Sequence, residues 1–204
     1  MGTFPVTEPP PAAASGEVSD PMPFMVARSR DEAHLYLDLH PCDEYGSADT
    51  TWDSALVVVD GEMANRYAGT CGGCGTNRQF WFGLPERETM PEGFPTFGGP
   101  EPSQLLDAGQ WRWVADLTSG ELPAGDPDEA RRSLAIAAAA VEEVVKFIPS
   151  GEDEVPQRAF WSEQGRQAYE AEPSRFTLTR RPAARTAYRD QAEEYPGEKA
   201  SERD

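Results

Sequence analysis

The chain has 204 residues, enough for one domain with a real core or for a small domain with an appended one. Its 36 acidic side chains against 18 basic ones give a net charge of −18, which repels phosphate backbones and disfavours nucleic-acid binding over most of the surface. The longest apolar run, residues 133–145, contains two glutamates and is too short for a membrane span of about 20 residues. We therefore expect no membrane role.

The chain holds three cysteines, an odd number, and its first 22 residues show neither the basic nor the apolar region of an export signal. A disulfide scaffold is not expected, and we predict a cytoplasmic protein in a reducing compartment. Residues 1–22 contain a proline triplet and mostly small side chains, so we predict a disordered tail there. A second disordered tail is predicted at residues 196–204.

The first half of the chain carries four segments with the pattern of strands. Residues 34–40, HLYLDLH, alternate between leucines and polar or aromatic side chains, which is typical of a half-buried strand. Residues 54–59 and 62–70 flank an Asp-Gly turn and predict a hairpin. A fourth strand is predicted at 77–84. These segments form a predicted antiparallel β module over residues 23–84.

The second half of the chain changes to a helical period. Residues 85–102 hold too many prolines and glycines for a regular element, and we predict a linker there. Residues 103–120 predict a helix with Ser103 as its N-cap. Residues 126–149 predict a longer helix that Asp126 caps.

Two shorter helical segments are predicted at residues 159–173 and 174–195, so that residues 103–195 form a helical module. The predicted fold class is α+β, with a small antiparallel zinc-ribbon-like sheet followed by a helical hairpin or a small helical bundle.

The candidate metal site begins with the C-x-x-C-G motif at residues 71–75, which lies between two predicted strands. A zinc site needs four ligands in a tetrahedron, usually two from each of two short loops, and this motif suits one loop. The other loop offers His40 and Cys42 at the end of the first predicted strand, where the two side chains would share a face. We predict a structural Zn²⁺ bound by His40, Cys42, Cys71 and Cys74.

Two other interpretations of the motif stay open. The first is thiol redox catalysis, but such a pair normally begins a helix, whereas an aromatic strand follows Cys74 here. The second is a turn made by the glycines whose thiols bind no metal. An enzyme built on the same cysteines and His40, with an open zinc position, is the main functional alternative.

Several segments together resemble a group of uncharacterised actinobacterial proteins with a zinc-ribbon-like region followed by helices. They are "LHPC", "RYAGTCGGCGTNRQFWFGLPE", "GGPEPSQLLDAGQW" and "FWSEQGR". The resemblance covers roughly residues 24–195 and implies a fold but no activity. It also implies a first knuckle with a second thiol, at the position where this chain has Tyr45.

One local feature opposes the acidic charge of the chain. Arg181, Arg185 and Arg189 are spaced four apart, so a helix would place them on one face. They either match acidic groups of the same molecule or form a partner-binding face for an acidic partner or a nucleic acid.

The function that we expect is protein interaction, as an adaptor, a regulator or an immunity-type binding partner. Because the chain is strongly acidic, a basic protein partner is the concrete version of this hypothesis. A nucleic-acid-binding regulator that uses the arginine face is the second alternative.

Overall fold

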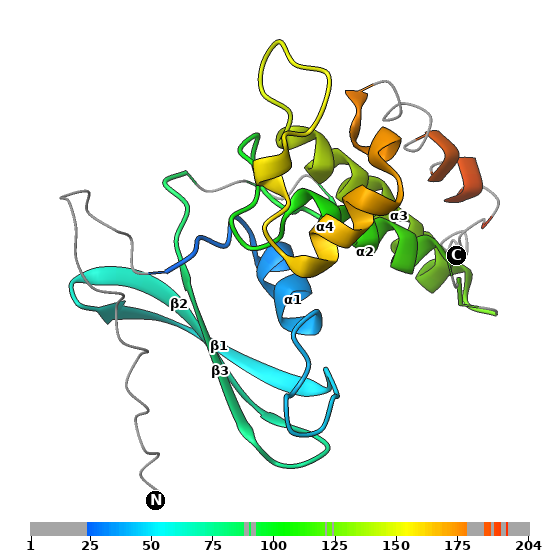
Figure 1. The fold of residues 1–204 in the computed structure, drawn as a ribbon. Coiled ribbons are helices and arrows are strands. Elements are labelled where there is room, and N and C mark those ends of the chain that lie inside the picture. Colours follow the sequence, from blue (N-terminus) through cyan, green and yellow to red (C-terminus); the bar gives the residue numbers. More distant parts are fainter. Residues whose placement is uncertain are drawn as a thin grey trace, which may run out of the picture.

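The computed structural model describes residues 24–87, 90, 93–120, 122–123, 125–178, 186–188, 190–192 and 195. The two predicted disordered tails lie outside these residues. A three-stranded sheet lies on one side of the molecule and a group of helices on the other, with a short helix between them (Figure 1). Within the described part of the chain, no helix is long and apolar enough to cross a membrane.

The sheet is antiparallel, with the order β1-β2-β3 and the bounds Thr50–Val59, Glu62–Cys71 and Asn77–Gly83. The predicted hairpin is confirmed, since Val59 pairs with Glu62 across a turn in which Asp60 has a φ of 53°. Asp and Gly tolerate the positive φ that such two-residue turns require. Thr50 pairs with Cys71 at the other end of the hairpin.

The first predicted strand, residues 34–40, is wrong: most of this segment belongs to the helix α1, Arg30–Asp38. Ser29 caps it by accepting a hydrogen bond from the Glu32 backbone N–H, and Ser29 with Glu32 forms the S-x-x-E pattern of a helix start. The helix buries Ala33 and Leu37, one turn apart, while Tyr36 packs edge-on against Phe82 of β3. The buried residues are therefore spaced as in a helix, although the alternation of leucines with polar residues had suggested a strand.

The helices α2, Ala108–Gly120, and α3, Pro127–Lys146, pack against each other, and α4, Glu163–Ala171, packs on α2. Short 3₁₀ turns lie at Gln157–Ala159 and Pro173–Phe176. The Asp126 cap is confirmed, because its carboxylate accepts hydrogen bonds from the backbone N–H groups of Asp128 and Glu129. The fold class, an α+β protein with a small antiparallel sheet followed by helices, is confirmed.

The helix predicted from Ser103 begins later, at Ala108. Ser103 accepts hydrogen bonds from the backbone N–H groups of Leu105 and Leu106, which closes a turn before the helix. The cap itself is Asp107, which accepts from the Gln110 N–H while the Gln110 side chain accepts from the Asp107 N–H.

One apolar core continues from the sheet side to the helices. The described residues of 85–102 form no helix or strand, yet Phe97 is buried there, with its ring 4.8 Å from that of Trp111 in α2. The division of the chain into two modules stays a prediction.

A buried group of charges also joins α1 to α3. Arg28, which precedes α1, forms ion pairs with Glu32 at 2.6 Å and with Glu143 of α3 at 2.8 Å. Lys146 forms a further pair with Glu143 at 2.5 Å. Both of these buried glutamates therefore have a cationic partner, which offsets the cost of removing them from water.

Candidate metal centre

The structure brings the three cysteines together at one end of the sheet. Cys42 lies in the loop after α1, Cys71 ends β2, and Cys74 lies in the turn before β3. Their Sγ atoms all lie within 4.8 Å of one another, and the Cys42 and Cys74 sulfurs are 3.6 Å apart. Zinc–sulfur bonds of about 2.3 Å in a tetrahedron place sulfurs roughly 3.8 Å apart, so this group has the dimensions of a metal site.

The two loops that carry these cysteines have the same hydrogen bonds. We call residues 42–47 the first knuckle and 71–76 the second knuckle. In both, the N–H of the leading cysteine donates to the carbonyl five residues later: Cys42 to Ser47 and Cys71 to Thr76, each at 2.9 Å. The two loops are therefore equivalent turns that face each other.

Both knuckles also close through a glycine at the same position. The N–H groups of Gly46 and Gly75 donate to the carbonyls of Cys42 and Cys71, at 2.6 and 2.9 Å. Their φ angles are 72° and 75°, in the left-handed region where a side chain would be strained. Glycine at this position lets the chain fold back so that the cysteine side chains project to one side.

The equivalence of the knuckles identifies the position of the missing fourth thiol. Cys74 is the fourth residue of the second knuckle, and Tyr45 is the fourth residue of the first. The Tyr45 ring lies against Gly73. A Cβ atom added to Gly73 would lie 2.0 Å from the Cδ1 atom of Tyr45. Tyr45 is also 60% exposed, so it covers the second knuckle from the solvent side.

The thiols of the site differ in acidity. The pKa of Cys74 is lowered to about 7 because the Thr76 hydroxyl and backbone N–H stabilise its thiolate. Burial raises the pKa of Cys42, although the backbone N–H groups of Glu44 and Tyr45 oppose this shift. Cys42 and Cys71 are almost fully buried, whereas Cys74 is exposed, so solvent reaches the group at Cys74.

The structure does not bring His40 into the cysteine group. His40 follows α1, and the strand on which it was predicted to share a face with Cys42 does not exist. Its Nδ1 atom lies 2.7 Å from the Tyr36 carbonyl oxygen, and its ring stacks on the Tyr36 ring at 3.9 Å. These contacts hold the imidazole on the α1 side of the site.

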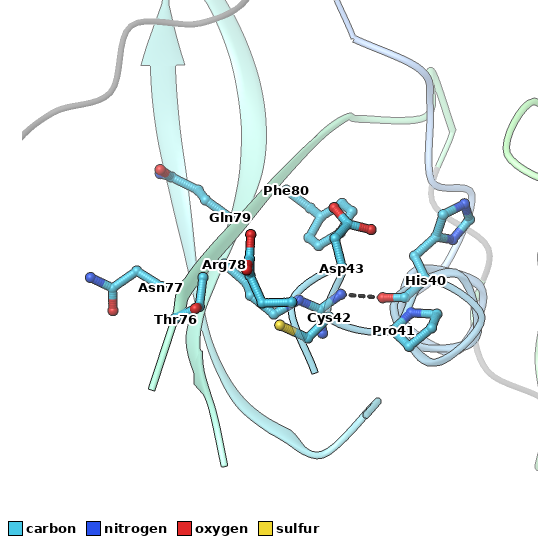
Figure 2. A pocket seen from close by; sticks show the side chains of 10 residues that line it. His40, Pro41, Cys42, Asp43, Thr76, Asn77, Arg78, Gln79 and Phe80 are labelled. Carbon is cyan, nitrogen blue, oxygen red and sulfur yellow. Dashed lines mark hydrogen bonds between the residues drawn. The ribbon is translucent and has the colours of Figure 1, made fainter. Parts of the chain in front are cut away.

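A hollow of about 340 Å³ lies beside Cys42, between residues 40–44 and 76–80 (Figure 2). Arg78 holds its wall together: its guanidinium donates to the His40 carbonyl and to the Thr50 hydroxyl, and lies 5.0 Å from the Trp52 ring centre. Arg78 thus fastens the start of β3 to the end of α1 and to β1.

The other predicted site residues, Arg181, Arg185 and Arg189, lie outside the described residues. The proposed arginine face therefore stays a prediction.

The fold and the site define a class: an α+β protein whose three-stranded sheet carries two facing cysteine knuckles at one end. No family model matches this chain, and searches of curated proteins and of solved structures find no match either. The resemblance to uncharacterised actinobacterial proteins stays an expectation.

Proposed function

We propose that the three cysteines hold a structural zinc ion that ties the two knuckles together. The observation that supports it best is the equivalence of the two loops, which aims three sulfurs at one point. A metal that joins the α1–β1 loop to the β2–β3 turn would contribute directly to folding, because it would link two loops that are far apart in the sequence. Thiolate ligands fit a reducing cytoplasm.

We propose protein interaction as the role of the stabilised sheet. The face of the sheet that carries Phe82 against α1 continues along the hairpin beyond that helix (Figure 1). There it presents Leu56, Val58 and Met63, which are 60%, 68% and 52% exposed. Large exposed apolar side chains that cluster in this way are typical of a binding surface.

The partner that fits this surface is a basic protein with an apolar patch. Asp60 and Glu62 are exposed at the hairpin turn beside Val58 and Met63, and the whole chain carries a net charge of −18. Such a field attracts cationic partners from solution and accelerates their association.

The test of the metal is its content by mass spectrometry, in protein purified without a histidine tag. We expect one zinc per chain in the wild type. The variants Cys42→Ser and Cys71→Ser should lose both the zinc and the cooperative unfolding transition. Asp43→Asn is the matched control, because it removes a carboxylate from the first knuckle without removing a sulfur. Metal-free wild type with the same stability as the cysteine variants would contradict the proposal.

The test of the surface uses a cationic peptide of lysine and leucine as the probe. Val58→Ser and Leu56→Ser should weaken its binding, and added salt should weaken it further. Leu117→Ser is the matched control, since Leu117 is 54% exposed but lies on α2. Equal binding by all three variants would exclude the hairpin as the docking surface.

A further inference from the structure

We propose that the metal centre is a three-thiolate site whose fourth position is exchangeable and takes a neutral nitrogen donor of the imidazole class. This inference rests on the zinc centre proposed above. It concerns what completes the coordination, and therefore which molecules the centre can bind.

The fourth position lies at the Tyr45 corner of the site. The shared hydrogen bonds of the two knuckles place Tyr45 where the second knuckle has Cys74. A thiol there would close a four-cysteine site, and structural zinc sites are almost always closed in this way. Tyr45 instead lies across Gly73, and no other His, Cys, Asp or Glu of the described residues joins the three sulfurs within 4.8 Å.

Solvent and other molecules can reach this corner. Tyr45 is 60% exposed, and Cys74 is exposed beside it, whereas Cys42 and Cys71 are buried below. A donor that arrives from outside therefore meets the metal from the side of Tyr45 and Cys74. An open fourth position is the feature that separates zinc sites that bind ligands from sites that only hold a fold.

Charge favours a neutral donor over an anion. Three thiolates and one Zn²⁺ carry a net charge of −1. The exposed carboxylates of Asp43, Glu44 and Asp49 lie in the same loop as Cys42. A fourth anion would add a second negative charge in an acidic molecule, which costs energy at any dielectric constant of the site. A neutral imidazole nitrogen is the zinc ligand that avoids this cost.

His40 is the imidazole of this chain that lies nearest in sequence, and its present contacts oppose its use as the ligand. Its Nδ1 is 2.7 Å from the Tyr36 carbonyl oxygen, and its ring is stacked on Tyr36. Coordination would require both contacts to break. We therefore infer that the imidazole comes from another molecule.

The experiment replaces zinc by Co²⁺, whose visible absorption reports the number and type of ligands. We expect the full chain to bind one Co²⁺ and its spectrum to shift in a saturable, one-to-one manner with imidazole, but not with azide. A Gly-His-Gly peptide distinguishes the two sources of this donor. Binding of the peptide at least as tight as that of imidazole assigns a histidine side chain, and weaker binding assigns a small molecule.

Three variants make the test specific. Tyr45→Cys should complete a four-thiolate site, abolish the imidazole response and raise metal affinity by about tenfold or more, because the effective concentration of a thiol held in the same chain outweighs the added negative charge. Tyr45→Ala removes the same ring without adding a ligand, so it should keep the response; loss of the response in both variants would overturn the assignment of the corner. His40→Ala should leave the Co²⁺ spectrum unchanged, and a changed spectrum would make His40 the fourth ligand and overturn the inference.

The outcomes separate the two proposals. A chain that binds no Co²⁺ refutes the metal centre itself. A chain that binds Co²⁺ with no response to imidazole, or with a response to azide instead, keeps the metal centre and refutes the neutral, exchangeable fourth position.

Discussion

The Sγ atoms of Cys42 and Cys74 lie 3.6 Å apart, yet the pKa values of the two thiols are shifted in opposite directions. The exposed Cys74 has a pKa lowered to about 7, because the Thr76 side chain and backbone N–H stabilise its thiolate, while burial raises the pKa of Cys42 above its usual value. Cys74 therefore offers a thiolate at neutral pH before any metal arrives. Metal binding would therefore have to displace a proton from Cys42, whereas Cys74 is already partly ionised at neutral pH.

We predict that iodoacetamide alkylates Cys74 of the metal-free protein with a rate that rises around a midpoint near pH 7. Thr76→Val should move this midpoint upward, since it removes the hydroxyl that stabilises the thiolate. Mass spectrometry of the alkylated peptides at each pH measures the rate for each cysteine. Faster alkylation of Cys42 than of Cys74 at pH 7 would contradict the assignment.

The sequence is enough to predict that the three cysteines come together. The pattern C-x-x-x-G followed by Ser or Thr occurs in both knuckles, at residues 42–47 and 71–76, and it marks both turns. The fourth predicted ligand, His40, does not join the cysteines, because its choice depended on a strand that does not form. A carbonyl and an aromatic ring near a histidine leave no signal in a sequence.

At the scale of elements, α1 shows how local patterns mislead. Leucines at 35, 37 and 39 alternate as in a strand, but Ala33 and Leu37 are the buried pair, one helical turn apart. The S-x-x-E pattern of Ser29 and Glu32 was the signal that favoured the helix. The β1–β2 hairpin was predictable because its two-residue Asp-Gly turn favours one pairing of the strands. The helix α3 was predictable because a long apolar stripe follows a clear N-cap.

The buried charges between α1 and α3 give a prediction for stability. Arg28→Ala leaves Glu32 and Glu143 buried without their main partner, so the free energy of unfolding should fall by about 3–5 kcal/mol. Arg131→Ala is the control, because its pair with Asp128 is on the surface and should change stability by less than about 0.5 kcal/mol. Chemical denaturation measures both. Equal effects would mean that the buried network does not join the two helices.

The contact between α2 and α4 depends on two glycines, Gly109 and Gly165, because a Cβ on Gly109 would meet the Gly165 backbone. A Cβ on Gly165 would lie 2.2 Å from the carboxylate of Asp107, which is fully buried and caps α2. Gly165→Ala should therefore destabilise the fold by about 1–3 kcal/mol, although alanine is the better helix former.

Gly120→Ala is the matched control, since no atom of the described residues, apart from its chain neighbours and its own helix backbone, lies within 4 Å of its Cβ position at the end of α2. This substitution should leave the free energy of unfolding unchanged or raise it by up to about 1 kcal/mol. A stable Gly165→Ala variant would show that α4 can move away from α2 without loss.

At the scale of the whole molecule, net charge acts on the fold as well as on partners. Twice as many acidic as basic side chains, 36 against 18, leave a net charge of −18, and the excess carboxylates repel one another. This repulsion disfavours the compact state, and dissolved salt reduces it because it shortens the distance over which charges act. The buried pairs between α1 and α3 are screened much less, because solvent ions do not reach them.

We therefore predict that salt stabilises the metal-free protein. Raising NaCl from about 0.01 M to about 0.15 M shortens the screening length from about 30 Å to about 8 Å. The melting temperature should rise by about 2–5 °C, as expected for a moderate gain in a domain of this size. Circular dichroism melts in the presence of a chelator measure the effect without any contribution from bound metal.

Sucrose is the control for effects that do not depend on charge. Sucrose of equal osmolality, added at both salt concentrations, should leave the difference in melting temperature between low and high salt unchanged. A melting temperature that falls with salt would mean that attractive ion pairs exposed to solvent, such as Arg131 with Asp128 and Arg175 with Asp116, outweigh the repulsion among the acidic surface groups. The sign of the salt effect thus decides whether charge pairing or charge excess governs the stability of this fold.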